Sequence, residues 1–195
     1  MITSQEMKQM EVRSNTPLIK LMENAGTAFV SELKKSTEIK NKSILVVCYH
    51  GKNGGDGFVI ADLLSKEAEI DVLFIGDEEK MVKETEHFFH HINNNPLIQF
   101  VTLETVEFDD YDLIIDAILG NGLHSNIKQD IAIAIDNINS ARAFTVSVDI
   151  PTGYHPDTGA IVDKGVDADL IITFHDTKPG LEQFKEKVVI VPIGL

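Results

Sequence analysis

Cysteine, tryptophan and long apolar runs are almost absent from the sequence. Its 195 residues include one cysteine and no tryptophan. The single cysteine, Cys48, excludes an internal disulfide framework and favours a reducing compartment. No apolar run approaches the roughly 18 residues of a membrane span, and the polar N-terminal segment MITSQEMKQME lacks the pattern of a signal peptide. We therefore expect a soluble, cytoplasmic protein.

Positive charge is also scarce. The sequence has 17 Lys and Arg against 31 Asp and Glu, a formal net charge of −14. The long-range field of such a chain repels polyanions, which argues against nucleic acid and anionic membrane surfaces as partners. A small anionic ligand is not excluded, because local hydrogen-bond donors can hold it.

Nothing in the sequence divides the chain. It has no fixed-period repeat, no low-complexity segment and no linker rich in proline and glycine. Hydrophobic residues make up 43% and charged residues 25%, as in ordinary globular proteins. The length is sufficient to bury a core. We therefore predict one folded domain over residues 1–195.

The first part of the chain carries helix signals. Thr3 and Glu6 have the spacing of a capping box. Thr16 followed by Pro17 predicts a second helix start, with Thr16 as the capping residue. Apolar residues then recur at spacings of three and four as far as Leu33, which predicts an amphipathic helix.

Beyond residue 42, strand-like segments alternate with helical patterns. Short apolar runs, typical of strands buried on both faces, occupy residues 43–48, 70–75, 98–101, 113–117, 143–148, 170–174 and 188–191. Helical patterns lie between most of them, at about 56–66, 80–93 and 126–139. This alternation predicts an α/β fold, a single Rossmann-like three-layer α/β/α domain with a mostly parallel sheet. Such sheets bind ligands beyond the carboxyl ends of their strands.

The first loop of interest, GKNGGDG at residues 51–57, follows a predicted strand and precedes a predicted helix. Four glycines in seven positions make sense if the backbone adopts positive φ and approaches a ligand closely. A run of amides at a helix start favours a phosphate, although a simple tight turn is the alternative. The GxGxxG and Walker patterns are both absent, which disfavours a nicotinamide dehydrogenase and a phosphate-loop ATPase.

Two further loops place aspartates at strand ends. Asp116 precedes the glycine-containing segment AILGNGL, and Asp149 begins the segment DIPTG, which contains Thr152. Parallel strands end at the same edge of a sheet, so these side chains can converge there with Asn53 and Asp56. Such hard oxygen ligands suit a hard cation.

Four motifs occur in order: LMENAG at 21–26, KNGGDG at 52–57, DAILGNGL at 116–123 and DIPTG at 149–153. With the late segments Thr173-Phe and Lys178-Pro-Gly-Leu, they resemble the NAD(P)H-hydrate epimerase family, the YjeF N-terminal domain. The resemblance covers nearly the whole chain. The chain departs from the family's pattern in Lys52 for asparagine, Leu119 for phenylalanine, Asn121 for threonine and Thr152 for serine.

The resemblance implies an isomerase of nicotinamide cofactor repair, which interconverts the R and S hydrates of NADH or NADPH. A separate dehydratase then acts on the S hydrate, because this length leaves no room for a fused dehydratase domain. The family commonly binds potassium and commonly forms homodimers.

Carried over residue by residue, the family's motifs imply a substrate-binding set and a potassium site. Substrate contacts are expected from Lys52, Asn53, Gly54, Gly55, Asp56, Gly120, Asn121, Gly122, Leu123, His124, Ser125, Asn126 and Asp149. Potassium ligands are expected from Asn53, Asp116 and Thr152.

Asp149 is the expected catalytic residue. Inversion at the hydrated carbon requires loss and return of the hydroxyl through an iminium-like species, or ring opening and reclosure. Either route needs a positioned proton donor and acceptor. Asp116 is expected to be occupied by the cation, which leaves Asp149 for acid–base work.

A non-catalytic nucleotide-ligand-binding or protein-interaction module on the same fold is the alternative to an enzyme. Lys178 also carries two interpretations: it either reaches an anion from the end of the late strand or lies in an exposed turn.

Overall fold

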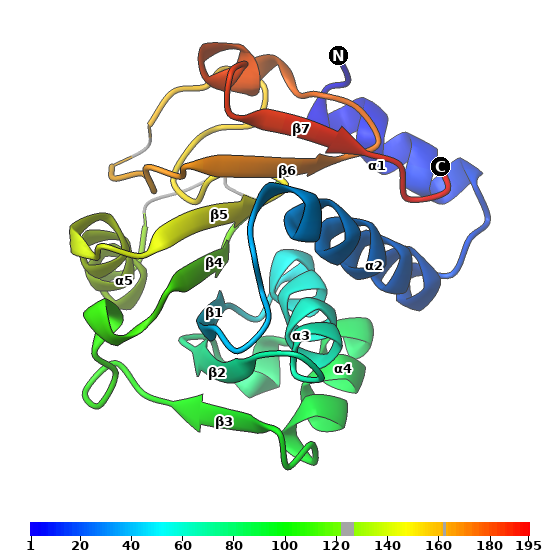
Figure 1. Cartoon of the computed structure of the whole chain (residues 1–195). Helices are drawn as coiled ribbons and strands as arrows, with labels where there is room; N and C mark the ends of the chain where they lie inside the picture. The colour runs from blue at the N-terminus through cyan, green and yellow to red at the C-terminus, as the bar shows by residue number, and fades with distance from the viewer. Residues whose placement is uncertain (122–126, 162) are drawn as a thin grey trace.

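The computed structural model describes residues 1–121, 127–161 and 163–195 (Figure 1). Its centre is one seven-stranded sheet in which every neighbouring pair is parallel, in the order β3-β2-β1-β4-β5-β6-β7. The strands are β1 (Ser43–Cys48), β2 (Glu69–Phe74), β3 (Ile98–Val101), β4 (Leu113–Ala117), β5 (Phe144–Val148), β6 (Leu170–Phe174) and β7 (Val188–Val191). The α/β prediction is confirmed.

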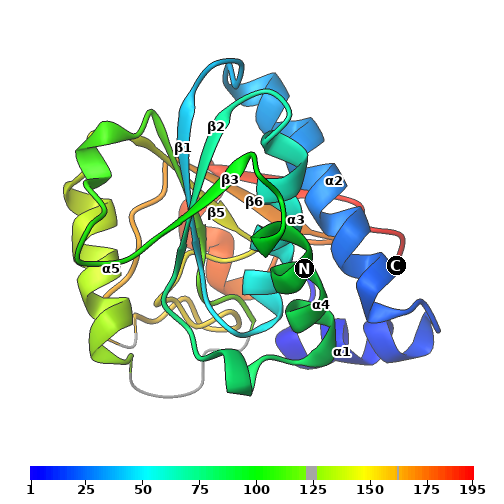
Figure 2. The ribbon, with the colours of Figure 1, turned by 90° about the horizontal axis from the view of Figure 1, so that it is seen from below.

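Helices cover both faces of this sheet. Figure 2 shows the sheet nearly edge-on, with α2, α3 and α4 on one side and α5 on the other, which is the predicted three-layer arrangement. The α-helices are α1 (Ser4–Arg13), α2 (Leu18–Ser36), α3 (Lys52–Leu64), α4 (Lys83–Asn93) and α5 (Gln129–Ser140). Short 3-10 helices span Glu78–Lys80, Phe108–Asp110 and Pro179–Phe184. In the described part of the chain, no helix is long and apolar enough to cross a membrane.

The central strand β1 is apolar from Ile44 to Cys48 because both of its faces are buried. In β1, Ile44, Val46 and Cys48 pack into the core under α2 and α3, while Leu45 and Val47 pack into the core under α5. Such double burial produces continuous apolar runs rather than alternation. Burial also raises the pKa of the Cys48 thiol well above its usual value, so this cysteine is a small core residue.

Four of the predicted helix starts are wrong by one to four residues, and those of α4 and α5 lie three residues later than predicted. α2 begins at Leu18 with Pro17 as its N-cap and no side-chain cap, so Thr16 does not cap it. α3 begins at Lys52 rather than 56, which makes the glycine-rich segment the first turns of a helix. The capping box of Thr3 and Glu6 on α1 is confirmed.

The glycines of α3 serve close packing rather than unusual backbone angles. None of the glycines between residues 51 and 57 has a positive φ, so that expectation is wrong. A Cβ on Gly54 would overlap the carbonyl oxygen of Tyr49, and one on Gly57 would lie 2.6 Å from the Ala117 side chain. Residues without side chains thus let α3 lie directly against the ends of β1 and β4.

The sheet order places a crevice at its centre. The chain runs outward from β1 to β2 and β3 on one side, and from β4 to β7 on the other. Loops that leave β1 and β4 therefore diverge, and the space between them is the usual ligand site of open parallel sheets.

Candidate active site

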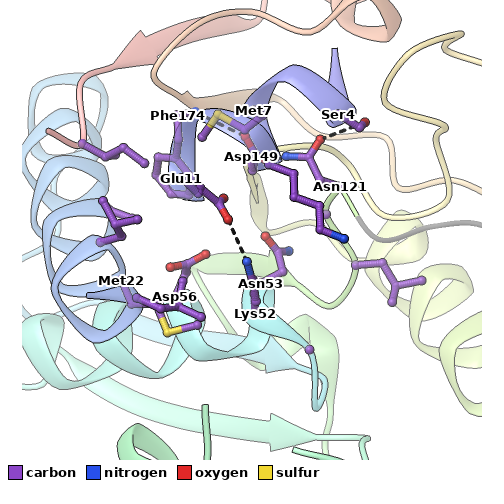
Figure 3. Close-up of a pocket in the computed structure, with 18 of the residues that line it drawn as sticks. Ser4, Met7, Glu11, Met22, Lys52, Asn53, Asp56, Asn121, Asp149 and Phe174 are labelled. Atoms are coloured by element: carbon purple, nitrogen blue, oxygen red, sulfur yellow. Dashed lines mark hydrogen bonds and ion pairs between the residues drawn. The ribbon is translucent and has the colours of Figure 1, made fainter. Parts of the chain in front are cut away.

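A cavity of about 690 Å³ lies at the carboxyl ends of the central strands. Figure 3 shows its wall built from the start of α3, the loop after β4 and the end of β5, with α1 crossing above it. Of the predicted substrate contacts that the structure describes, six line it: Lys52, Asn53, Asp56, Gly120, Asn121 and Asp149.

The remaining predicted contacts lie elsewhere. Gly54 and Gly55 are buried in packing contacts, Gly54 against Tyr49 and Gly55 against Met22 and Thr85. Neither is among the residues that line the cavity, so their role in binding stays a prediction. The predicted contacts Gly122, Leu123, His124, Ser125 and Asn126 lie outside the described residues.

Asp149 lies on the cavity wall directly after β5, and hydrogen-bond donors surround its carboxylate. Asn121 Nδ2 donates to Oδ2 at 2.6 Å. Thr173 Oγ1 and the Phe174 amide donate to Oδ1 at 2.9 and 3.3 Å. Lys178 forms an ion pair with the same oxygen. The residue is buried and has φ of 65°, a left-handed conformation that a non-glycine residue adopts only when its surroundings fix it.

The structure decides between the two interpretations of Lys178, because its side chain binds an anion and is not exposed. It is fully buried, and besides Asp149 its ammonium group donates to Thr173 Oγ1 at 2.8 Å and to the Phe174 carbonyl at 2.9 Å. A buried ammonium with three acceptors is a compensated charge. Lys178 therefore fixes the Asp149 carboxylate, and unlike Asp149 it is not among the residues that line the cavity.

Asp116 lies near the end of β4 and is fully buried, outside the set of residues that line the cavity. Thr152 donates to it twice, through its amide at 2.8 Å and its hydroxyl at 2.6 Å. The Ser147 hydroxyl donates at 2.8 Å. Burial raises the pKa of Asp116 above its usual value, although these hydrogen bonds oppose the shift. The contacts join the ends of β4 and β5.

Asn53 completes the set of predicted metal ligands. Its side-chain Nδ2 is buried and has no hydrogen-bond partner in the described part of the chain. A Cβ on Gly120 would lie 2.8 Å from Asn53 Oδ1. The next residue back, Leu119, accepts from and donates to the hydroxyl of Thr152. Asn53 thus lies against the same loop that meets Thr152, and through Thr152 against Asp116.

This oxygen-rich corner fits a hard cation. The orphaned amide position of Asn53 becomes a carbonyl oxygen if the amide turns over, and a buried oxygen without a donor suits a cation. The carboxylate of Asp116 and the hydroxyl of Thr152 supply further oxygens. Among the described residues, no group of three or more His, Cys, Asp or Glu side chains could hold a metal ion.

The cavity mouth contains a charged bridge. Lys52, at the start of α3, pairs with Glu11 of α1 at 2.7 Å (Figure 3). Asp56 lies one turn further along α3 and faces the cavity. Burial raises the pKa of Asp56 well above its usual value, and the charges of Asp149 and Glu11 raise it further, while Lys52 opposes the shift.

α1 was missed as a contributor to the site. It supplies Ser4, Met7 and Glu11 to the cavity lining. Ser4 is fixed by Asp157, which accepts from its amide at 2.8 Å and from its hydroxyl at 3.1 Å. The capping box gave the position of this helix but no signal for what it covers.

Comparison with known proteins finds relatives that match most of this chain. The family model described as "YjeF-related protein N-terminus" matches residues 18–180, a range that contains every cavity-lining element except α1 and the C-terminal residue Ile193. An NAD(P)H-hydrate epimerase from Nitrosopumilus maritimus is 34% identical and covers 88% of this chain and 86% of its own. One from Oenococcus oeni is 33% identical, covering 90% and 85%.

Longer relatives also match. The bifunctional NAD(P)H-hydrate repair enzyme Nnr of Methanothermobacter thermautotrophicus is 38% identical over 85% of this chain. The chain spans 33% of the length of that relative. Among solved structures, the yeast protein YNL200c has a TM-score of 0.83 at 20% identity, covering 98% of this chain and 87% of its own, which shows a shared fold.

Proposed function

This chain belongs to the family of YjeF-related protein N-terminal domains, and from that premise we propose that it is an NAD(P)H-hydrate epimerase. It interconverts the R and S hydrates of NADH and NADPH, an isomerase reaction of cofactor repair. The observation that carries the proposal is the placement of the buried Asp149 on a cavity built from the loops whose motifs resemble the family.

In this proposal, the ring of the hydrate lies against Asp149. Loss of the hydroxyl with help from the ring nitrogen creates a positive, iminium-like ring, and a fixed carboxylate stabilises that charge. Lys178 and Thr173 hold the carboxylate in place, so it does not reorganise during the reaction. Asn121 Nδ2 donates to its other oxygen.

We propose that the phosphates of the substrate lie at the start of α3. The first amides of a helix have no acceptor within the helix and favour a phosphate. Lys52 stands at this position with its ammonium half exposed and paired to Glu11, so a phosphate can share it.

Potassium is the proposed cation, held by Asn53, Asp116 and Thr152. When bound, it supplies positive charge that neutralises Asp116 and ties together the loops after β4 and β5. Replacing potassium by tetramethylammonium should lower the unfolding temperature of the wild type, and Asp116→Asn should remove that difference. Equal unfolding temperatures in both salts for the wild type would oppose the cation site.

We further propose that a dehydratase acts on the S hydrate, which the bifunctional names of longer relatives support. We propose that the protein is cytoplasmic, in keeping with its single, buried cysteine, and that it forms a homodimer. Light scattering of the purified chain tests the dimer.

The decisive experiment follows the R and S hydrates by chromatography after addition of the protein to purified R hydrate, with NADH and NADPH hydrates tested in parallel. The uncatalysed interconversion is the control. We expect acceleration by the wild type, and loss of most turnover with retained binding in Asp149→Asn, assayed well below its unfolding temperature. Ligand binding without acceleration would favour the alternative, a non-catalytic binding module.

A further inference from the structure

We propose that Asp56 is a second catalytic residue, the general acid that gives a proton to the departing hydroxyl of the hydrate. The inference rests on the proposed epimerase function and assigns a separate chemical task within the same cavity. Asp149 then acts as a fixed anion rather than as the proton carrier that the sequence alone suggested.

The proposal starts from the partners of each carboxyl group that lines the cavity. Asp149 receives four donors, Glu11 pairs with Lys52, and Asp157 accepts from the amide and hydroxyl of Ser4. Within residues 1–121, 127–161 and 163–195, no hydrogen bond or ion pair reaches the Asp56 side chain. Among the described carboxyl groups that line the cavity, Asp56 is therefore the one without a protein partner, and it can contact a ligand.

The position of Asp56 supports a proton-carrying role. It lies on the rigid first turns of α3, whose glycines pack against β1 and β4, and Figure 3 shows its carboxyl facing the cavity between Met22 and Glu11. A catalytic group on a packed helix keeps its geometry better than one on a loop.

The charges around Asp56 favour its protonated form. Glu11 on α1 and Asp149 at the end of β5 are negative, and Lys52 on α3 is the positive group that opposes them. Lys8 of α1 also lines the cavity, whereas α2 contributes only the apolar side chains of Leu18, Leu21, Met22 and Ala25. Together with burial, these charges raise the pKa of Asp56 well above its ordinary value.

Asp149 and Asp56 are therefore a pair of carboxyl groups in opposite environments. Asp149 is neutralised by a buried lysine and saturated with donors, whereas Asp56 has neither. Pairs of acids whose surroundings separate their protonation states divide acid and electrostatic tasks between them.

The reaction balances without any further reactant. The Asp56 carboxyl gives its proton to the hydroxyl as the C–O bond breaks, and the electron pair of that bond stays on oxygen, so water leaves. The lone pair of the ring nitrogen forms the C=N bond. Water then adds to the opposite face of the ring carbon, the C=N electrons return to nitrogen, and the added water loses a proton to solvent. Asp56 regains a proton from solvent.

The test compares Asp56→Asn with the wild type in the R-hydrate assay. Asparagine keeps the size of the side chain and cannot give a proton, so we expect a loss of about 10²–10⁴-fold in kcat with the dissociation constant for NADH hydrate within about threefold. Asp62→Asn is the matched control, because Asp62 lies on the same helix away from the cavity lining. Its kcat should stay within about twofold.

A second measurement does not depend on Asp56→Asn. The acid must be protonated, so kcat of the wild type, corrected for the uncatalysed rate, should fall as pH rises through the raised pKa of Asp56. Glu11→Gln removes one negative charge that faces Asp56. It should move this fall to lower pH by roughly half a pH unit, as expected for one screened charge.

The outcomes separate the two proposals. Wild-type acceleration with unchanged kcat in a folded Asp56→Asn overturns the role of Asp56 and leaves the epimerase standing. A pH profile that Glu11→Gln does not move also overturns it. Absence of any acceleration by the folded, ligand-bound wild type overturns both the epimerase and the acid.

Discussion

Replacing Lys178 by methionine should destabilise the protein more than any exposed charge removal. The side chain of Lys178 is 0% exposed and that of Asp149 is 7% exposed. Methionine fills nearly the same space but carries no charge and donates no hydrogen bond. The variant therefore leaves the Asp149 carboxylate buried beside an apolar group, with Asn121, Thr173 and the Phe174 amide as its remaining donors.

The size of the effect follows from the burial. Removing one partner of a buried ion pair costs about 3–5 kcal/mol, because an uncompensated charge remains. For a chain of this length, each kcal/mol lowers the unfolding temperature by about 2–4 °C. We therefore expect the unfolding temperature of Lys178→Met to fall by about 6–20 °C.

Urea unfolding followed by circular dichroism measures the change. Lys187→Met is the matched control, because Lys187 pairs with Asp167 at 3.0 Å while the two side chains are 41% and 79% exposed. Its free energy of unfolding should change by less than about 1 kcal/mol. The double variant Lys178→Met, Asp149→Asn should recover part of the loss, since no charge stays unpaired. A single variant Lys178→Met within about 1 kcal/mol of the wild type would refute the reasoning.

Three further predictions concern the helix, the cation and the acid. Gly54→Ala should disrupt the packing of α3, because the added Cβ would overlap the Tyr49 carbonyl. It should lower the free energy of unfolding in urea by more than about 3 kcal/mol. Gly51→Ala is the control: its Cβ meets no atom within 4 Å, so the free energy of unfolding should change by less than about 1 kcal/mol. Added potassium should raise the unfolding temperature of the wild type, measured by calorimetry, and Asp116→Asn should not respond. Asp56→Asn should be more stable than the wild type. Since burial raises the pKa of Asp56, wild-type stability falls as pH rises from the ordinary carboxyl range through that pKa, and the advantage should widen over this window in urea unfolding. A constant difference would contradict it.

The strands could be predicted because their signal is local. Both faces of the sheet are covered, so the strands are rich in apolar residues and stand out from the polar segments that flank them. The start of α3 could not be predicted, because glycine lowers helix propensity wherever it stands. Position 54 is a glycine because the backbone there lies against Tyr49, and this contact is a property of tertiary packing.

The part of the site that could be predicted from the sequence is the set of polar residues at strand ends. Asp116 and Asp149 were found because topology alone brings strand ends together. Lys178 could not be ranked, since its acceptor Asp149 stands 29 residues earlier and nothing local distinguishes a buried lysine from an exposed one. The contribution of Glu11 to the cavity mouth was equally invisible, because it depends on where α1 lies across the sheet.

The arrangement also explains why the Asp149 carboxylate lies directly after a strand rather than on a longer loop. Asp149 holds a left-handed backbone and a buried charge, both of which cost free energy. The groups that compensate them, Thr173 and Lys178, come from β6 and the segment just after it. β6 pairs with the last three residues of β5, directly before Asp149. The strained residue is therefore fixed by the sheet itself. Changes in β6 that never touch a ligand should then alter turnover through the position of Asp149, whereas changes in α1 should alter how a ligand enters.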